Sequence, residues 1–284
     1  MDYEIKHDTF TDTSSMQALV DLQNIVYAGK HSFTEKAFRF WYLDNPNGQV
    51  VSFNAWKGEV MAAHYAVVPT RMNIGGRIVK GVLSMATVTH PEHRGKGLFK
   101  TLAKATYEYA ESNGYEFVIG VANDNSYPGF IKYFPFEDVG LLEVLIGMKT
   151  GIKPDGEKLF SVHWDKETIA WRAKGPKYSY FAGHLYGTIG FGPFKTAPCI
   201  KTFMGTLDEQ LLEGTSIPCK RPGKRFMTLY VGMGSNARKL GYVKAPKALH
   251  KSGFHLIYLD LTNGKLPKMT RDNVFFQLVD FDVA

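Results

Sequence analysis

The segment best suited to chemistry is a short glycine-rich stretch that follows a largely apolar run. Residues 82–89 are mostly apolar, position 91 is a proline, and Arg94-Gly95-Lys96-Gly97 then precedes an amphipathic segment. This order predicts a strand, a turn and a helix. Glycines in such a turn let the backbone approach a ligand closely, and the N–H groups that open the helix can bind one anion. The pattern therefore predicts a site for a phosphate-bearing ligand.

Two other interpretations of this turn start from the same residues. One is a plain connection between a strand and a helix, with no ligand. The other is a dinucleotide-binding loop, which requires G-x-G-x-x-G/A and an acidic residue about twenty positions later. Lys100 stands where the third small residue belongs, and Glu116 is a poor match for the acidic one. The G-K-S/T ending of a P-loop does not occur here.

The first half of the chain contains the elements that would position the turn. We expect a helix to about residue 27 capped by Ser14 or Ser15, and an aromatic-rich helix capped by Thr34. Strands are expected over 50–56, 60–72, from the Gly75-Gly76 turn to residue 90, and over 115–122. A helix over 97–112 would bury Leu98, Leu102, Ala105 and Tyr109. A strand, a crossover helix and a strand imply a parallel pair, so the predicted fold class is α/β, a mixed sheet with helices on both sides.

The second half of the chain has fewer clear secondary-structure patterns. A polar, Gly- and Pro-bearing segment near 148–158 predicts a linker, which gives domains 1–150 and 151–284, and strands are expected over 226–231, 255–261 and 274–279. Trp41 precedes Pro46 by five residues, and Trp171 precedes Pro176 by the same spacing. This echo suggests a diverged copy of the first half, without its glycine-rich turn. One active site is then expected in the first half, with the second half helping to form the acceptor site.

Composition narrows the class of partner. The 284 residues carry a net charge of +7, but the Lys and Arg residues are scattered, with no basic helix or aromatic stacking signature, so nucleic acid is not expected. No segment has the roughly 18 apolar residues of a membrane span, and the N-terminus lacks a secretory signal. Only Cys199 and Cys219 occur. We expect a cytoplasmic protein with free thiols, and the oligomeric state stays open.

The strand–turn–helix segment resembles the R/Q-x-x-G-x-G/A signature of the GNAT acyltransferases. Arg94, Gly95, Lys96, Gly97 and Leu98 carry the resemblance, and the preceding Thr-His-Pro-Glu-His resembles the family's V-x-P-x-x-R lead-in. The sequence departs from the signature at Phe99, where the family has a small residue. The resemblance covers about residues 1–150 and implies the GNAT fold, with a splayed central sheet flanked by helices. Together with the Trp–Pro echo, it suggests that the second half is a GNAT-like domain that has diverged.

The resemblance also implies an acyl-CoA co-substrate and no metal. The implied CoA-binding residues are Thr87, Val88 and Thr89 for pantetheine, Arg94, Gly95, Lys96, Gly97, Leu98 and Phe99 for the pyrophosphate, and Asn123 at the family's asparagine position. The run from Asn123 to Lys132 more closely resembles two-domain members from bacterial surface-polysaccharide pathways. Those proteins acylate nucleotide-linked amino sugars, and this implies a dTDP-3-amino-3,6-dideoxyhexose as acceptor and an acetyl or 3-hydroxyacyl group as donor.

N-acylation by a thioester requires a neutral amine, a polarised carbonyl and a stabilised thiolate. His64, in a strand expected beside the acceptor, is the first candidate base; a hydrogen-bonded core histidine or a water relay are the alternatives. The tyrosine that protonates the thiolate in many members of the family is missing, since Phe130 or Ile131 stands at its position. Tyr127 is the candidate substitute, with Tyr133 as the second choice.

The acceptor is the least determined part. Trp41, Tyr42 and Tyr65 could form an aromatic wall for a sugar or base, although core packing is the common use of such residues. Another amine, such as an aminoglycoside or a peptide, is the alternative acceptor. A non-catalytic acyl-CoA sensor is the alternative of a different class.

Overall fold

The structure is a computed structural model that describes residues 3–28, 33–149, 151–175, 182–183, 188–193, 200–211, 227–250 and 252–281. The chain forms two compact units that interleave along the sequence. Unit 1 comprises Met1–Thr70, Lys80–Ile119 and Asp260–Leu266; unit 2 comprises Arg71–Val79, Gly120–Leu259 and Pro267–Ala284. The division at about residue 150 stays a prediction.

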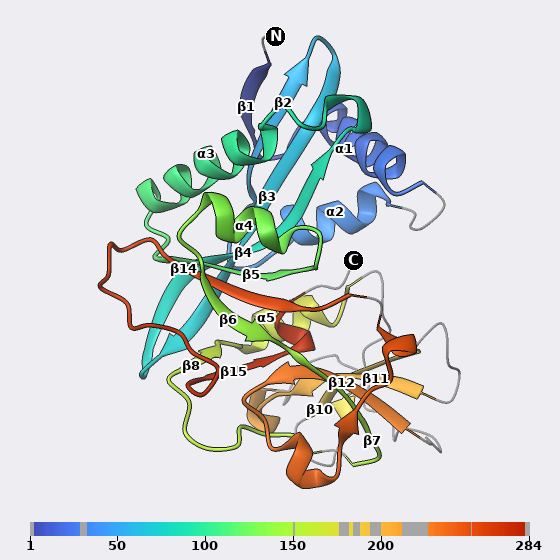
Figure 1. The fold of residues 1–284 in the computed structure, drawn as a ribbon, viewed down its shortest axis with the longest axis vertical. Coiled ribbons are helices and arrows are strands. Elements are labelled where there is room, and N and C mark those ends of the chain that lie inside the picture. The colour runs from blue at the N-terminus through green and yellow to red at the C-terminus, as the bar shows by residue number, and fades with distance from the viewer. Residues whose placement is uncertain are drawn as a thin grey trace. The chain divides into compact units, whose positions relative to one another are not determined.

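Unit 1 is built on neighbouring strands, β1 to β5 (Figure 1). They are β1 (Glu4–Asp8), β2 (Val51–Lys57), β3 (Val60–Ile74), β4 (Arg77–Thr89) and β5 (Phe117–Ala122), of which β3 to β5 also extend into unit 2. The β1–β2 and β2–β3 pairs are antiparallel. Helix α3 (Leu98–Ser112) connects β4 to its neighbour β5, and the Glu116 N–H donates to the Lys80 carbonyl at 2.8 Å. The predicted strand–helix–strand unit is confirmed.

Helices cover both faces of this sheet. Successive side chains of a strand point to opposite faces. In β3, His64 is hydrogen-bonded to Tyr42 of α2 (Glu35–Tyr42), whereas Tyr65 is hydrogen-bonded to Tyr107 of α3. Helix α1 (Thr13–Val26) packs beside α2. The predicted mixed α/β class, with helices on both sides, is therefore confirmed.

Two local predictions in unit 1 need correction. Asp12, not Ser14 or Ser15, caps α1, because its carboxylate accepts the Ser14 N–H. Thr34 caps α2 as expected. The buried face of α3 was also predicted partly wrong, because Ala105 and Tyr109 are only half-buried. The buried residues are Leu98, Leu102, Ala103, Thr106, Tyr107 and Ala110.

Gly81 in β4 makes a close contact that a larger residue would prevent. A Cβ atom built there would lie 2.4 Å from the ring of Phe117 in β5, whose side chain is fully buried. We therefore expect Gly81→Ala to lower the free energy of unfolding by about 1–3 kcal/mol, the usual cost of overpacking. Urea denaturation should show that Gly81→Ala/Phe117→Leu is less destabilised than the two single variants added together. Additive effects would contradict this contact.

The described residues of unit 2 form mainly strands, with two short helices. The helices are α4 (Tyr127–Tyr133) and α5 (Lys166–Arg172). The strands are β6 (Glu137–Leu141), β7 (Glu143–Gly147), β8 (Phe160–Val162), β9 (Ala182–Gly183), β10 (Thr188–Pro193), β11 (Ile200–Thr206), β12 (Met227–Met233), β13 (Val243–Lys244), β14 (His255–Asp260) and β15 (Val274–Gln277). Short 3-10 helices are η1 (Pro91–His93) in unit 1, and η2 (Glu209–Leu211), η3 (Ala237–Leu240), η4 (Lys247–Leu249) and η5 (Leu278–Asp280) in unit 2.

The centre of unit 2 is the strand β12. It pairs with β11 in parallel and with β7 and β15 in antiparallel orientation. A core of Leu145, Ile152, Phe203, Tyr230, Ala237 and Tyr242 packs around it. The strands predicted near 226, 255 and 274 are confirmed as β12, β14 and β15. Cys199, Cys219 and Pro176 lie outside the described residues, so the expectations that rest on them stay predictions.

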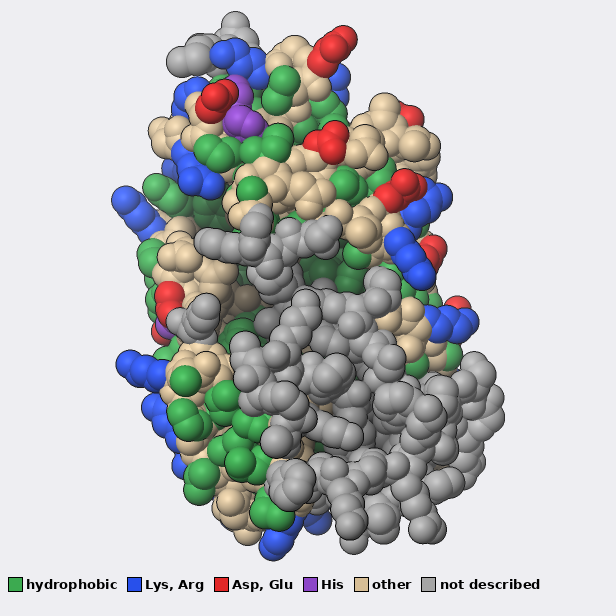
Figure 2. Space-filling model, turned by 90° about the vertical axis from the view of Figure 1, so that its right-hand side faces the viewer, with side chains coloured by type: hydrophobic (Ala, Val, Ile, Leu, Met, Phe, Trp, Pro, Cys, Tyr) green, Lys and Arg blue, Asp and Glu red, His purple; other side chains and the backbone are tan. Residues whose placement is uncertain are grey.

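The described residues contain no membrane-spanning helix, and the face drawn in Figure 2 shows no single basic patch. No helix among the described residues is long and apolar enough to cross a membrane. On the face drawn in Figure 2, the Lys and Arg side chains are scattered among apolar and other groups. This distribution matches the scattered basic residues of the sequence.

Candidate active site

The predicted anion-binding turn lies between β4 and α3. After β4 ends at Thr89, η1 occupies Pro91–His93 and Gly97 takes the N-cap position of α3. Gly97 has a φ of 73° and Gly95 has the same value. Residues with a Cβ atom meet steric resistance in this left-handed region. Both glycines of the motif therefore have a conformational reason to be glycine.

The first turn of α3 leaves backbone N–H groups open to a ligand. The N-terminal N–H groups of a helix have no acceptor within the helix, and no side chain caps α3. A Cβ atom built on Gly95 or Gly97 would meet no heavy atom of the described residues within 4 Å. The space at the turn is thus open, and the helix dipole of a 15-residue helix favours an anion in it.

The side chains of the turn divide into exposed cations and inward apolar groups. Arg94, Lys96 and Lys100 are exposed, and the Lys96 ammonium also donates to the Glu92 carbonyl at 3.1 Å. Leu98 is buried, and the Phe99 ring meets the Tyr65 ring edge-on at a centroid distance of 6.0 Å. The departure from the signature at Phe99 therefore adds an inward packing contact to β3.

The strand end that precedes the turn holds Thr87, Val88 and Thr89. Val88 is buried, whereas the two threonines are half-buried. The His90 N–H donates to the Ala62 carbonyl of β3 at 2.9 Å, which fixes the outgoing end of β4. Binding of pantetheine by these three residues stays a prediction.

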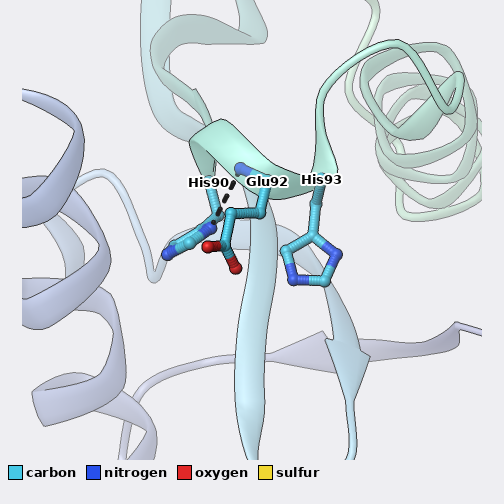
Figure 3. Close-up of side chains that lie close together, drawn as sticks. All are labelled: His90, Glu92 and His93. Carbon is cyan, nitrogen blue, oxygen red and sulfur yellow. Dashed lines mark hydrogen bonds between the residues drawn. The ribbon is translucent and has the colours of Figure 1, made fainter.

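Two histidines and a glutamate meet directly before the turn (Figure 3). His90, Glu92 and His93 are the group among the described residues with the spacing of a potential metal site, their ligand atoms lying within 4.8 Å of one another. The His90 Nδ1 accepts the Glu92 N–H at 3.3 Å, and the His93 Nδ1 is 2.8 Å from the Tyr3 hydroxyl. Burial, then the charges of Lys96, His90 and Lys57, lower the pKa of His93. This positive surrounding suits an anion better than a cation.

His64 lies inside unit 1, in a chain of hydrogen bonds. Its side chain is 1% exposed, its Nδ1 is 2.7 Å from Asn54 Oδ1, and its Nε2 is 2.9 Å from the Tyr42 hydroxyl. The Asn54 Nδ2 donates to the Asp8 carboxylate, so the amide oxygen faces His64 and the Nδ1 carries the proton. Burial lowers the pKa of His64 to about 3. These contacts favour the alternative of a hydrogen-bonded core histidine.

The three residues of the predicted aromatic wall differ in their burial. Tyr42 and Tyr65 are 1% and 0% exposed. Burial raises the pKa of both hydroxyl groups, and for Tyr65 it reaches about 12. The Tyr65 hydroxyl is 2.9 Å from Ser84 Oγ and 2.6 Å from the Tyr107 hydroxyl. Both tyrosines thus pack in the core, while Trp41 is half-buried.

The loop after β5 belongs to unit 2 and contains Asn123 and Tyr127. The Asn123 side-chain oxygen accepts the N–H groups of Asn125 and Ser126, both at 3.0 Å, and shapes the turn into α4. The half-buried Tyr127 donates its hydroxyl to Asp138 Oδ2 at 2.7 Å. This hydrogen bond raises the pKa of Tyr127. Tyr133, the second choice, is 43% exposed.

Sequence reasoning missed two residues of this loop environment. His255 in β14 stacks on Tyr127 with a centroid distance of 3.9 Å. Its Nε2 lies 3.0 Å from Asp124 Oδ1. Asp124 is adjacent to the predicted Asn123, but its partner is 131 positions away in the sequence. No local pattern could have connected the two.

Comparisons with known proteins agree with this geometry. Residues 10–137 match the family described as "Acetyltransferase (GNAT) domain". No curated protein matches the sequence. Among solved structures, a conserved protein from Enterococcus faecalis described as a probable N-acyltransferase is 12% identical and aligns with a TM-score of 0.61 over 92% of this chain and 73% of its own. This likeness shows that the fold is shared over both halves of the chain.

Shorter structural matches cover about half of the chain. The ribosomal-protein-S18-alanine N-acetyltransferase from Escherichia coli is 13% identical, with a TM-score of 0.39 over 50% of this chain and 82% of its own. An aminoglycoside 6′-N-acetyltransferase complexed with coenzyme A is 11% identical, with a TM-score of 0.41 over 49% of this chain and 88% of its own. Residues 10–137 are thus similar to GNAT acetyltransferase domains, and this family match indicates that the chain is an acyltransferase.

Proposed function

We propose that this acyltransferase transfers an acyl group from acyl-CoA to the amino group of a nucleotide-linked sugar, with a dTDP-3-amino-3,6-dideoxyhexose as the example. One observation carries the donor half of the proposal. The turn before α3 holds two glycines with positive φ, an uncapped helix start and open space. Such a site suits the pyrophosphate of CoA, which needs several N–H donors at once.

The donor would extend from this turn along the end of β4. The N–H groups of residues 94–99 would bind the pyrophosphate, with Arg94 and Lys96 adding charge. Peptide groups of Thr87, Val88 and Thr89 would bind pantetheine, and the Val88 N–H would polarise the thioester carbonyl. Asn123 would complete the CoA contacts from the following loop.

The reaction needs no covalent enzyme intermediate. The neutral amine attacks the thioester carbonyl carbon, the C–S bond breaks, and the thiolate leaves. Tyr127 is the proposed proton donor to the thiolate, because its hydroxyl is hydrogen-bonded and its side chain is only half-buried. His64 is left out of this proton path, because both of its ring nitrogens already have buried partners.

The acceptor class is supported by charge and by one aromatic residue. A net charge of +7 suits an anionic sugar diphosphate better than a polycationic aminoglycoside. Trp41 is the member of the predicted aromatic wall that stays half-buried and could contact a sugar or base. Tyr42 and Tyr65 are left to the core.

The test is a thiol-release assay with acetyl-CoA and 3-hydroxybutanoyl-CoA. The acceptors are dTDP-, UDP- and GDP-linked amino sugars, an aminoglycoside and a lysine-containing peptide. We expect the highest kcat/KM with a dTDP-amino sugar. Faster turnover of the aminoglycoside or the peptide would show that the acceptor belongs to that class instead. CoA binding without turnover of any amine would favour a non-catalytic acyl-CoA sensor.

A further inference from the structure

The loop after β5 and the strand β14 form a charged cluster in unit 2. Asp124 Oδ2 accepts the Gly253 N–H at 2.9 Å and the Ser252 hydroxyl at 3.1 Å, and Asp124 Oδ1 lies 3.0 Å from His255 Nε2. These bonds, with the Gly253 N–H first, lower the pKa of Asp124. The carboxylate is therefore ionised at neutral pH and held in one position.

Gly253 allows this arrangement by its lack of a side chain. A Cβ atom built there would lie 2.7 Å from Asp124 Oδ1 and 3.3 Å from His255 Nε2. Any larger residue would push into the hydrogen bond between the two side chains. The backbone thus approaches the Asp124–His255 pair as closely as glycine permits.

The partner of His255 fixes which ring nitrogen carries the proton. An ionised carboxylate only accepts hydrogen bonds, so the Nε2 must be the donor to Asp124. The Nδ1 of the neutral ring then holds a lone pair, and none of the described residues donates a hydrogen bond to it. The side chain is 18% exposed. His255 therefore has the protonation pattern of a general base that a carboxylate orients.

The Tyr127 ring packs against one face of the His255 imidazole. The two rings stack with an interplanar angle of 20°, and the Tyr127 hydroxyl is itself held by Asp138. The Arg271 guanidinium donates to the carbonyl of Leu141, the residue paired with His255. A candidate base and the proposed acid thus lie in contact, although they come from distant parts of the sequence.

We infer that His255 is the general base of the acyl transfer, oriented by Asp124 as a positioning residue. The inference rests on the proposed N-acyltransferase function and on the place of Tyr127 in it. The His255 Nδ1 takes a proton from the acceptor nitrogen as that nitrogen bonds to the thioester carbonyl carbon. The C–S bond breaks with its electron pair on sulfur, and the thiolate takes its proton from the Tyr127 hydroxyl. The base returns its proton to solvent, and water reprotonates the tyrosinate.

The experiment compares His255→Gln with His255→Phe, which keeps a ring on Tyr127 but has no nitrogen. Both should lower kcat/KM by about 100-fold or more, as expected for loss of a general base, and both should lose the fall in rate at acid pH. The affinity for CoA, measured by calorimetry, should stay within about twofold of the wild type. Asp124→Asn should lower kcat/KM less, by about tenfold, and keep the acid limb.

The control is His163→Gln, which removes a histidine of the same unit outside the cluster and should leave the kinetics unchanged. Wild-type kcat/KM and an unchanged acid limb in His255→Gln would overturn the inference while leaving the N-acyltransferase function in place. A wild type that binds CoA but acylates no amine would overturn the proposed function and this inference together. Circular dichroism of each variant shows that the fold is retained.

Discussion

Gly97→Leu should reduce the affinity for CoA by at least about 100-fold, which is the largest binding effect we expect from any single change. The leucine side chain would occupy the open space at the start of α3 where the pyrophosphate is proposed to lie. It would also push the ligand away from N–H groups that act together. Calorimetric titration of the purified variant with CoA measures the loss.

The matched control is Gly114→Leu at the other end of the same helix. Gly114 has a φ of 80°, close to the 73° of Gly97, and a Cβ atom at either position would meet no described heavy atom within 4 Å. Each substitution should therefore cost a similar free energy of unfolding, about 1–2 kcal/mol for a left-handed residue. Only Gly97→Leu should lose CoA binding. Equal CoA affinity in the two variants would show that the pyrophosphate does not bind at this turn.

The parts of the site that the sequence predicts well are those with local causes. Gly97 and the helix after it follow from a signature of a few consecutive residues, and the Thr34 cap depends on an N–H three positions later. The buried face of α3 was predicted less well, because Tyr107, which is buried and hydrogen-bonded to Tyr65 in β3, lies outside the predicted apolar stripe. The spacing of apolar residues along a helix does not by itself show which of two neighbouring helix faces packs against the sheet.

Pairs that are distant in sequence decide what each titratable residue can do. His64 was a candidate base and a candidate core residue from the sequence alone. Asn54 and Tyr42 settle its surroundings, and they are 10 and 22 positions away on other elements. No sequence pattern indicated a role for His255, since its partner Asp124 is 131 positions away. Chemistry that depends on such pairs cannot be derived from local spacing.

His64 should make the stability of unit 1 depend steeply on pH below its ordinary range. Burial holds its pKa at about 3, whereas the unfolded chain binds the proton at about 6.5. Above pH 6.5 both states are neutral, and the hydrogen-bonded network contributes fully. As the pH falls from 6.5 towards 3, only the unfolded state takes up the proton, so the free energy of unfolding should fall by about 1.4 kcal/mol per pH unit.

The comparison with His64→Gln isolates this contribution, because Asp280 acts in the opposite direction. Burial raises the pKa of Asp280 to about 7, so its contribution falls as the pH rises from about 4 to 7. Asp280 is present in both proteins and cancels in the difference. From pH 6.5 to 5, wild-type stability minus His64→Gln stability should fall by about 2 kcal/mol in urea denaturation. A constant difference, or His64 NMR signals that titrate between pH 7 and 5, would show that the ring binds a proton in the folded state.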